Sequence, residues 1–162
     1  RPHTKSVQII FNMLRLKPAE EFFNLAKDKG VAIIVRVPLA SGLLTGKMNS
    51  NSTFPENDHR NYNINGDAFD VGETFSGVDF NTALKVVEEL KSITPEGFSL
   101  SQLALKWILM HDAVSVIIPG AKNSDQALNN ISASSLPDIS NLMKQIENIY
   151  ATYLKDDIHP RW

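Results

Sequence analysis

Residues 35–47 read VRVPLASGLLTGK, and residues 117–130 read IIPGAKNSDQALNN. Each stretch opens on β-branched apolar residues, continues through small residues and then meets helix-forming sequence. A buried strand that ends in a Gly- and Ser-containing loop before a helix lets backbone amides approach a phosphate. The two stretches therefore predict a pair of strand–loop–helix units that bind phosphate groups.

The sequence before the first of these loops predicts a βαβ unit. Residues 7–11 (VQIIF) are typical of a short buried strand, and residues 31–37 (VAIIVRV) of a strand buried on both faces. Pro18 suits the first turn of an intervening helix, and Gly30 suits its left-handed C-terminal cap. Strand, helix and strand over about thirty residues make one βαβ unit.

A long polar segment precedes two predicted helices. Residues 48–78 are rich in Asn and Gly, and a loop of this length is usually a functional lid or disordered. Asp79 is expected to cap a helix that runs to about Ser92. Ser99 and Gln102 have the spacing of a capping box for the next helix.

A third strand and two further helices follow. Residues 114–118 predict the strand, either Asn123 or Ser124 caps a short helix, and Asp138 starts the final helix. Strands that alternate with helices predict an α/β fold with a parallel sheet. Three parallel strands cannot close a barrel, and the chain opens on Arg1 rather than Met, so we expect a piece of a larger protein.

Composition excludes several classes of function. The 162 residues are 43% hydrophobic with a net charge of -2, which suits one globular unit with a core. Lys and Arg are scattered, so nucleic-acid binding is not expected. The absence of cysteine excludes disulfides and thiolate chemistry and suits a reducing compartment, so we expect a cytoplasmic protein. The longest apolar run is too short to cross a membrane.

The histidines and tyrosines do not predict a site of their own. No HxH or HExxH spacing occurs, so no metal site is expected. His111 ends a predicted helix, where a partly cationic ring would face the negative pole. Tyr150 and Tyr153 are interpreted as helix packing residues, and Trp107 as core.

The two loops carry a resemblance to a known family. Residues 7–14 (VQIIFNML), 37–47 (VPLASGLLTGK) and 118–131 (IPGAKNSDQALNNI) resemble the sixth, seventh and eighth strand regions of an aldo-keto reductase. The order and spacing of the segments agree over essentially the whole chain. The resemblance implies that residues 1–162 are the C-terminal portion of a single (β/α)₈ TIM barrel domain, with about three parallel strands, covering helices and no closed barrel. It also implies NADP(H) as cofactor and small carbonyl compounds as substrates of a hydride transfer.

The resemblance assigns cofactor-binding roles to particular residues. Gln8 would meet the nicotinamide carboxamide, and Arg60 in the long loop would lie near the adenosine end. Residues matching the loop along the pyrophosphate are Pro38, Leu39, Ala40, Ser41, Gly42, Leu43, Thr45 and Lys47. Residues matching the adenosine-phosphate pocket are Gly120, Lys122, Gln126, Asn129 and Asn130.

Three positions depart from the family pattern. Arg36 stands where many members have an aromatic ring that stacks on the nicotinamide, Lys122 where many have Arg, and Phe11 where a Tyr is frequent. A guanidinium plane can also stack, so Arg36 is kept among the cofactor-binding candidates. The catalytic Tyr, Lys, Asp and His of the family lie on strands two to four, so no residue of this chain is assigned a catalytic role.

Each assignment has an alternative based on the residues alone. The loop glycines suit a strand end as well as a phosphate, and a buried Gln8 needs a partner that is either backbone or cofactor. Gln126 and Asn130 share one helix face, which is either an exposed polar face or an adenine contact. For the whole protein, the alternatives are a non-catalytic cofactor-binding regulatory module and a barrel enzyme of another class that binds a phosphorylated substrate. Free sheet edges would also favour self-association.

Overall fold

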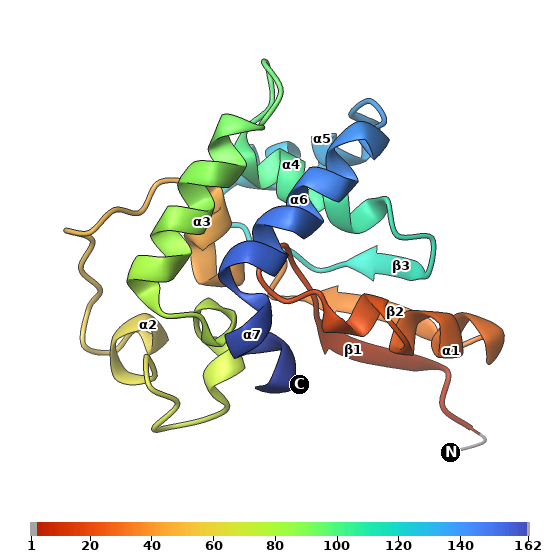
Figure 1. Cartoon of the computed structure of the whole chain (residues 1–162), viewed down its shortest axis with the longest axis horizontal. Coiled ribbons are helices and arrows are strands. Elements are labelled where there is room, and N and C mark those ends of the chain that lie inside the picture. Colours follow the sequence, from red (N-terminus) through yellow and green to blue (C-terminus); the bar gives the residue numbers. More distant parts are fainter. Residues whose placement is uncertain (1–2, 162) are drawn as a thin grey trace.

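Three parallel strands organise the chain, in a computed structural model that describes residues 3–161 (Figure 1). They are β1 (Ser6–Ile10), β2 (Ala32–Arg36) and β3 (Val114–Ile117), paired in the order β1-β2-β3. The predicted strands are confirmed to within one residue at every end. The shared direction brings the loops that follow the strands to one edge of the sheet.

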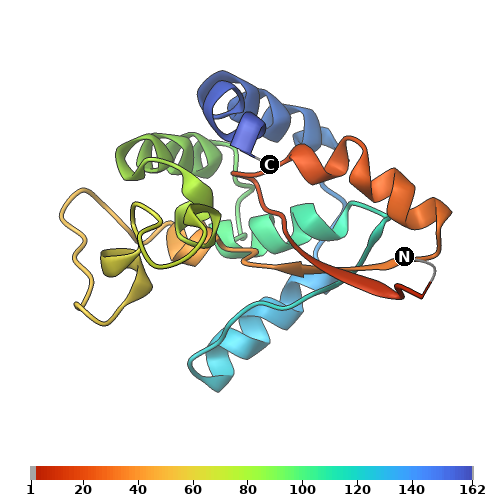
Figure 2. The ribbon, with the colours of Figure 1, turned by 90° about the horizontal axis from the view of Figure 1, so that it is seen from below.

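The two faces of the sheet differ. Ile33 and Val35 are fully buried. Figure 2 shows most of the helices on one side of the sheet and α5 on the other. On the other face Ile34 is half-buried and its neighbour in register, Val116, is 44% exposed. The near-continuous apolar character of β2 is typical of a strand in a parallel sheet, where both faces are usually covered.

Seven α-helices and six short 3₁₀ helices surround the sheet within the described residues. The α-helices are α1 (Phe22–Asp28), α2 (His59–Tyr62), α3 (Phe80–Ser92), α4 (Leu100–Leu109), α5 (Ser124–Ser132), α6 (Ser140–Tyr153) and α7 (Lys155–Ile158). The 3₁₀ helices are η1 (Lys17–Ala19), η2 (Ala40–Thr45), η3 (Val71–Glu73), η4 (Phe75–Gly77), η5 (Ala133–Ser135) and η6 (His159–Arg161). In the part of the chain that the structure describes, none of these helices has both the length and the apolar character of a membrane span.

Most predicted helix caps are present. Asp79 accepts a hydrogen bond from the backbone N–H of Thr82, and Ser99 with Gln102 forms the reciprocal capping box. Asn123 caps α5 by accepting from the N–H of Gln126. Gly30 adopts a left-handed φ of 61° after α1, as expected for a helix C-terminus.

Two helix starts differ from the prediction. Pro18 lies in the separate 3₁₀ helix η1, and α1 begins only at Phe22. α6 begins at Ser140, where the Asp138 carboxylate accepts from the Ser140 N–H without being the N-cap residue. In both cases the α-helix begins later in the sequence than the pattern predicted.

The core contains a cluster of packed aromatic rings. Phe11 stacks on Trp107 with ring centroids 4.9 Å apart, and both are buried. His111 packs edge-on against both rings. Burial lowers the pKa of His111, which opposes the partial positive charge that the helix end would favour. The burial of Tyr150 confirms its packing role, whereas Tyr153 is 39% exposed.

The segment 48–78 is folded back on itself rather than open. Asn63 is fully buried, and its side-chain oxygen accepts from the N–H groups of Ala68 and Phe69. Its amide donates to Thr74, which also contacts His59. These contacts build α2, η3 and η4 into the loop, so the segment has defined structure in place of the disorder that its composition allowed.

Candidate functional site

The loop after β2 has a strained backbone. Val37, Ala40 and Ser41 have φ angles of 52°, 47° and 56°, a region that non-glycine residues rarely occupy. Such conformations cost about 1–3 kcal/mol each and cluster at functional sites. Gly42, with φ of 96°, continues the turn without that cost. The loop therefore has a shape that neighbouring contacts must hold.

Hydrogen bonds to neighbouring segments supply those contacts. The Ser41 hydroxyl donates to the Glu73 carbonyl and accepts from the Phe75 N–H, both at 3.1 Å. The side-chain amide of buried Asn12 donates to the Val37 carbonyl at 2.9 Å and to the Ser76 hydroxyl at 2.8 Å. The loop after β2 is thereby fastened to the end of the segment 48–78.

The loop after β3 is braced by its own helix. The Gln126 side chain accepts from the Lys122 N–H at 2.8 Å, and Asn130 donates to the Gly120 carbonyl at 3.1 Å. Both amides share one face of α5, as the spacing predicted. Their role in the structure is to fix residues 120–122 against the start of the helix.

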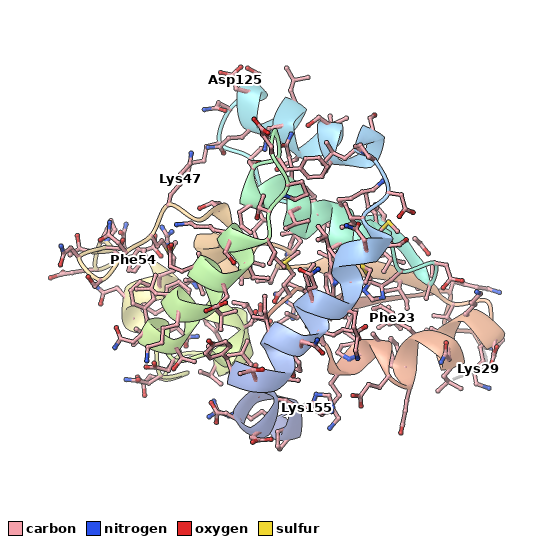
Figure 3. All side chains as sticks on the ribbon, turned by 45° about the horizontal axis from the view of Figure 1, so that its top comes forward. Phe23, Lys29, Lys47, Phe54, Asp125 and Lys155 are labelled. Atoms are coloured by element: carbon pink, nitrogen blue, oxygen red, sulfur yellow. The ribbon has the colours of Figure 1, made fainter. Side chains whose placement is uncertain are left out.

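Residues of both loops line one open cleft of about 1520 Å³. Figure 3 shows Lys47 between the segment that carries Phe54 and the helix that carries Asp125. The predicted site residues that line this cleft are Pro38, Leu39, Ser41, Gly42, Thr45, Lys47, Arg60, Gly120, Lys122, Gln126, Asn129 and Asn130. Residues almost eighty positions apart in the sequence thus form one concave surface.

Two lysines supply unpaired positive charge in the cleft. Lys47 follows the loop after β2, and Lys122 precedes α5. Neither ammonium group has a hydrogen-bond or ion-pair partner among residues 3–161. Asp125, in the first turn of α5, is the opposing unpaired acid in the lining. Unpaired cations therefore outnumber unpaired acids there, which favours an anionic ligand.

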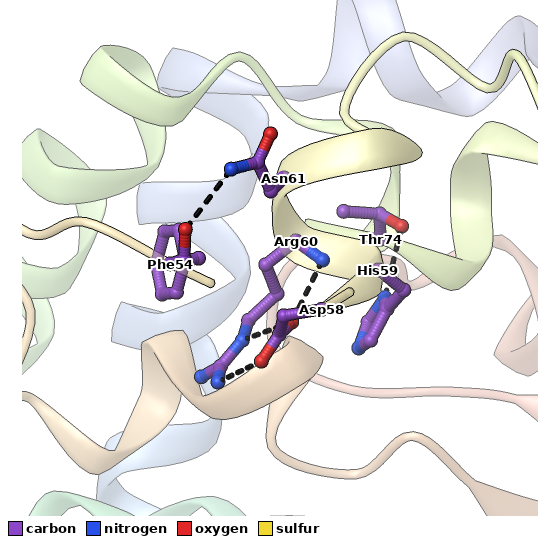
Figure 4. Close-up of polar contacts among 6 residues, drawn as sticks. All are labelled: Phe54, Asp58, His59, Arg60, Asn61 and Thr74. Atoms are coloured by element: carbon purple, nitrogen blue, oxygen red, sulfur yellow. Dashed lines mark hydrogen bonds and ion pairs between the residues drawn. The ribbon is translucent and has the colours of Figure 1, made fainter. Parts of the chain in front are cut away.

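Arg60 is held by its own segment (Figure 4). Its Nε and Nη2 atoms donate to the two Asp58 carboxylate oxygens at 2.9 and 2.6 Å, and its guanidinium lies 4.5 Å from the Phe54 ring centroid. The hydrogen bonds from Arg60 hold the pKa of Asp58 well below its usual range. Because Asp58 neutralises it, Arg60 offers a flat stacked surface rather than a free charge.

Four predicted site residues lie outside the cleft. Gln8 and Arg36 line a separate cavity of about 260 Å³, where Arg36 is paired with Glu73. Ala40 and Leu43 are fully buried in the core, so neither offers a contact surface to a ligand. The chain reverses direction through the positive φ angles of Ala40, Ser41 and Gly42, and Ala40 and Leu43 on either side of this turn pack into the core.

Several lining residues were not predicted. Met48, Phe54, Asp58, His59 and Phe69 all come from the segment 48–78. The sequence does show a carboxylate two residues before Arg60 and aromatic residues nearby. It does not show how this segment folds, so these residues could not be placed in the cleft. Asn12 and Ser76 were also missed, since a contact over 64 positions leaves no local pattern.

Comparisons with known proteins agree with this architecture. Residues 3–151 match the aldo/keto reductase family. The aldo-keto reductase YhdN of Bacillus subtilis is 28% identical over 97% of this chain and 45% of its own length. A probable voltage-gated potassium channel subunit beta of Arabidopsis thaliana is 34% identical over 76% of this chain and 36% of its own length. The glycerol dehydrogenase AKR11B4 of Gluconobacter oxydans has a similar structure, with a TM-score of 0.73 at 22% identity over 92% of this chain and 43% of its own.

These matches establish the class of protein. The chain belongs to the aldo/keto reductase family, and its three parallel strands with covering helices correspond to the C-terminal portion of that family's TIM barrel. It spans less than half the length of the relatives that it matches.

Proposed function

We propose that this chain forms the NADP(H)-binding wall of an oxidoreductase that reduces aldehydes and ketones to alcohols. The bound cofactor would supply the hydride, and the protein would bind and orient it. Residues of the loop after β2 would lie along the pyrophosphate, and Lys122 with the start of α5 would hold the 2′-phosphate.

The observation that carries this proposal is that Lys47 and Lys122, which come from two different loops, line the same cleft. A dinucleotide phosphate has anionic groups at two separated places, and an unpaired ammonium group from each loop supplies a cation to both parts of the lining. The start of α5 adds unpaired backbone N–H groups beside Lys122. The guanidinium plane of Arg60, which is stacked on Phe54, offers a planar group against which an adenine ring would pack.

Direct binding tests the proposal. Titration of the protein with NADPH, followed by nucleotide fluorescence, is expected to saturate, and NADH is expected to bind more weakly because it lacks the 2′-phosphate. Binding of a sugar phosphate without binding of NADPH would favour a barrel enzyme of another class.

A second candidate is a cofactor-binding regulatory subunit without rapid turnover. It is favoured by the similarity to a probable potassium channel subunit beta. Both candidates require NADPH binding, so turnover separates them. Rapid aldehyde-dependent oxidation of NADPH by the whole protein supports the reductase, whereas tight binding without oxidation supports the regulatory subunit.

A further inference from the structure

The strained residues of the structure occur in two segments that contact each other. Among residues 3–161, the non-glycine residues with positive φ are Val37, Ala40, Ser41, Phe75 and Ser76. The first three belong to the loop after β2 and the last two to the end of the segment 48–78. Strain confined to one place suggests a shape that function requires.

Val37 is the least favourable of these positions. It is β-branched, and for such residues a φ of 52° is an outlier. Val37 follows β2 directly and lines the cleft. Its backbone sets the direction of the chain toward Pro38 and Gly42, which also line the cleft.

Asn12 holds both strained segments at once. Its side chain is fully buried, and every polar atom of it is used. The amide nitrogen donates to the Val37 carbonyl and the Ser76 hydroxyl, and the amide oxygen accepts from the Leu14 N–H at 2.9 Å. A bond from Asn12 therefore fixes the carbonyl of the strained residue itself.

We propose that Asn12 is a positioning residue for the cleft: it maintains the left-handed conformation of Val37 and, through it, the wall formed by residues 37–42. This inference takes only the identity of the ligand, NADPH, from the proposed function. Without Asn12, Val37 relaxes toward an extended conformation and a fraction of molecules lose the binding-competent wall. The apparent affinity for the ligand falls in proportion to the fraction of molecules that keep the wall.

Glycine tests the proposed cause because it adopts positive φ without strain. In an Asn12→Ala background, Val37→Gly makes the left-handed conformation accessible without the amide. Ser76→Gly is the matched control, because Ser76 also has positive φ and also contacts Asn12 but does not line the cleft. If glycine acted only by relieving backbone strain in general, the two glycine variants would recover NADPH affinity equally.

The experiment measures NADPH dissociation constants well below the melting temperature of every variant. Asn12→Ala is expected to weaken binding about tenfold, the effect of losing one to two net hydrogen bonds. Adding Val37→Gly is expected to recover most of the loss, and adding Ser76→Gly clearly less. Unchanged affinity in Asn12→Ala, or equal recovery by both glycines, would overturn the proposal. If Asn12→Ala does not fold, Asn12→Leu replaces it, since a side chain of similar volume fills the same space but cannot donate to Val37.

A second measurement does not depend on the cofactor. The Ala40 N–H donates to the Val37 carbonyl and the Gly42 N–H to the Leu39 carbonyl, so both report on the turn. Their hydrogen exchange is expected to accelerate in Asn12→Ala and to slow again with Val37→Gly. Unchanged exchange contradicts the positioning role, whereas absence of NADPH binding by the unaltered protein contradicts only the proposed function.

Discussion

Arg36, the last residue of β2, forms a two-pronged ion pair with Glu73 of η3, 37 positions further along the chain. Nη1 and Nη2 each meet a different carboxylate oxygen. The pair joins the end of the central strand to the segment 48–78. Arg36 is therefore engaged by the protein itself at the position where many family members have a stacking ring.

This pair is expected to stabilise the fold measurably. A double-mutant cycle with Arg36→Gln and Glu73→Gln should give a coupling energy of about 1 kcal/mol, because fork-to-fork pairs with partial burial lie at the upper end for surface pairs. The control is Lys144 with Glu147, an exposed pair at 3.3 Å, expected to couple by about 0.3 kcal/mol. Denaturant unfolding of the variants measures both, and equal coupling in the two cycles would contradict the assignment.

The Asp58–Arg60 pair predicts a loss of stability in acid. Because its hydrogen bonds with Arg60 lower the pKa of Asp58, its contribution is fully present above the unfolded-state pKa of about 3.9 and is lost as pH falls toward the folded-state pKa. Asp58→Asn should lower the free energy of unfolding at neutral pH, and the gap to the unaltered protein should narrow below about pH 4. A gap that stays constant down to acid pH would show that the carboxylate charge contributes nothing.

His111 predicts a pH dependence nearer neutrality. Burial lowers its pKa, so the unfolded chain binds more protons between the folded and unfolded pKa values. Stability is therefore full above about pH 6.5 and falls as pH is lowered below that value. In His111→Phe this decline should be reduced, while His3→Gln, a change at an exposed position, should retain it. Parallel pH profiles for His111→Phe and the unaltered protein would refute the prediction.

Lys122 distinguishes the two nicotinamide cofactors. If its ammonium group meets the 2′-phosphate, Lys122→Ala should weaken NADPH binding by roughly 1.5–3 kcal/mol, the range for hydrogen bonds to charged groups. NADH binding should barely change. Lys144→Ala on α6, a lysine with a 79% exposed side chain outside the cleft, is the control and should affect neither cofactor. If Lys122→Ala weakened the binding of NADPH and NADH equally, Lys122 would contact a part of the ligand other than the 2′-phosphate.

Local signals account for what the sequence predicted. The apolar runs located the strands, and Asp79, Ser99 and Asn123 marked helix starts because each cap acts within three residues. Parallel strands carry their following loops to one sheet edge, so the two halves of the cleft could also be inferred. The phosphate role of these loops stays a prediction.

The missed features depend on long-range contacts or on turn geometry. Asn12 meets Ser76 across 64 positions, and Arg36 meets Glu73 across 37, so no window of sequence displays either contact. Leu43 was assigned to the cofactor loop from the resemblance alone, which does not reveal which side chains of the loop are buried. The kinked turn at Ser41 and Gly42 precedes Leu43, which is fully buried in the core.

The most direct test is a crystal structure of the protein with NADPH bound. The account predicts the pyrophosphate along residues 37–47 and the 2′-phosphate within hydrogen-bond distance of the Lys122 ammonium group. NADPH bound outside the cleft, or in it with the 2′-phosphate away from Lys122, would contradict the account.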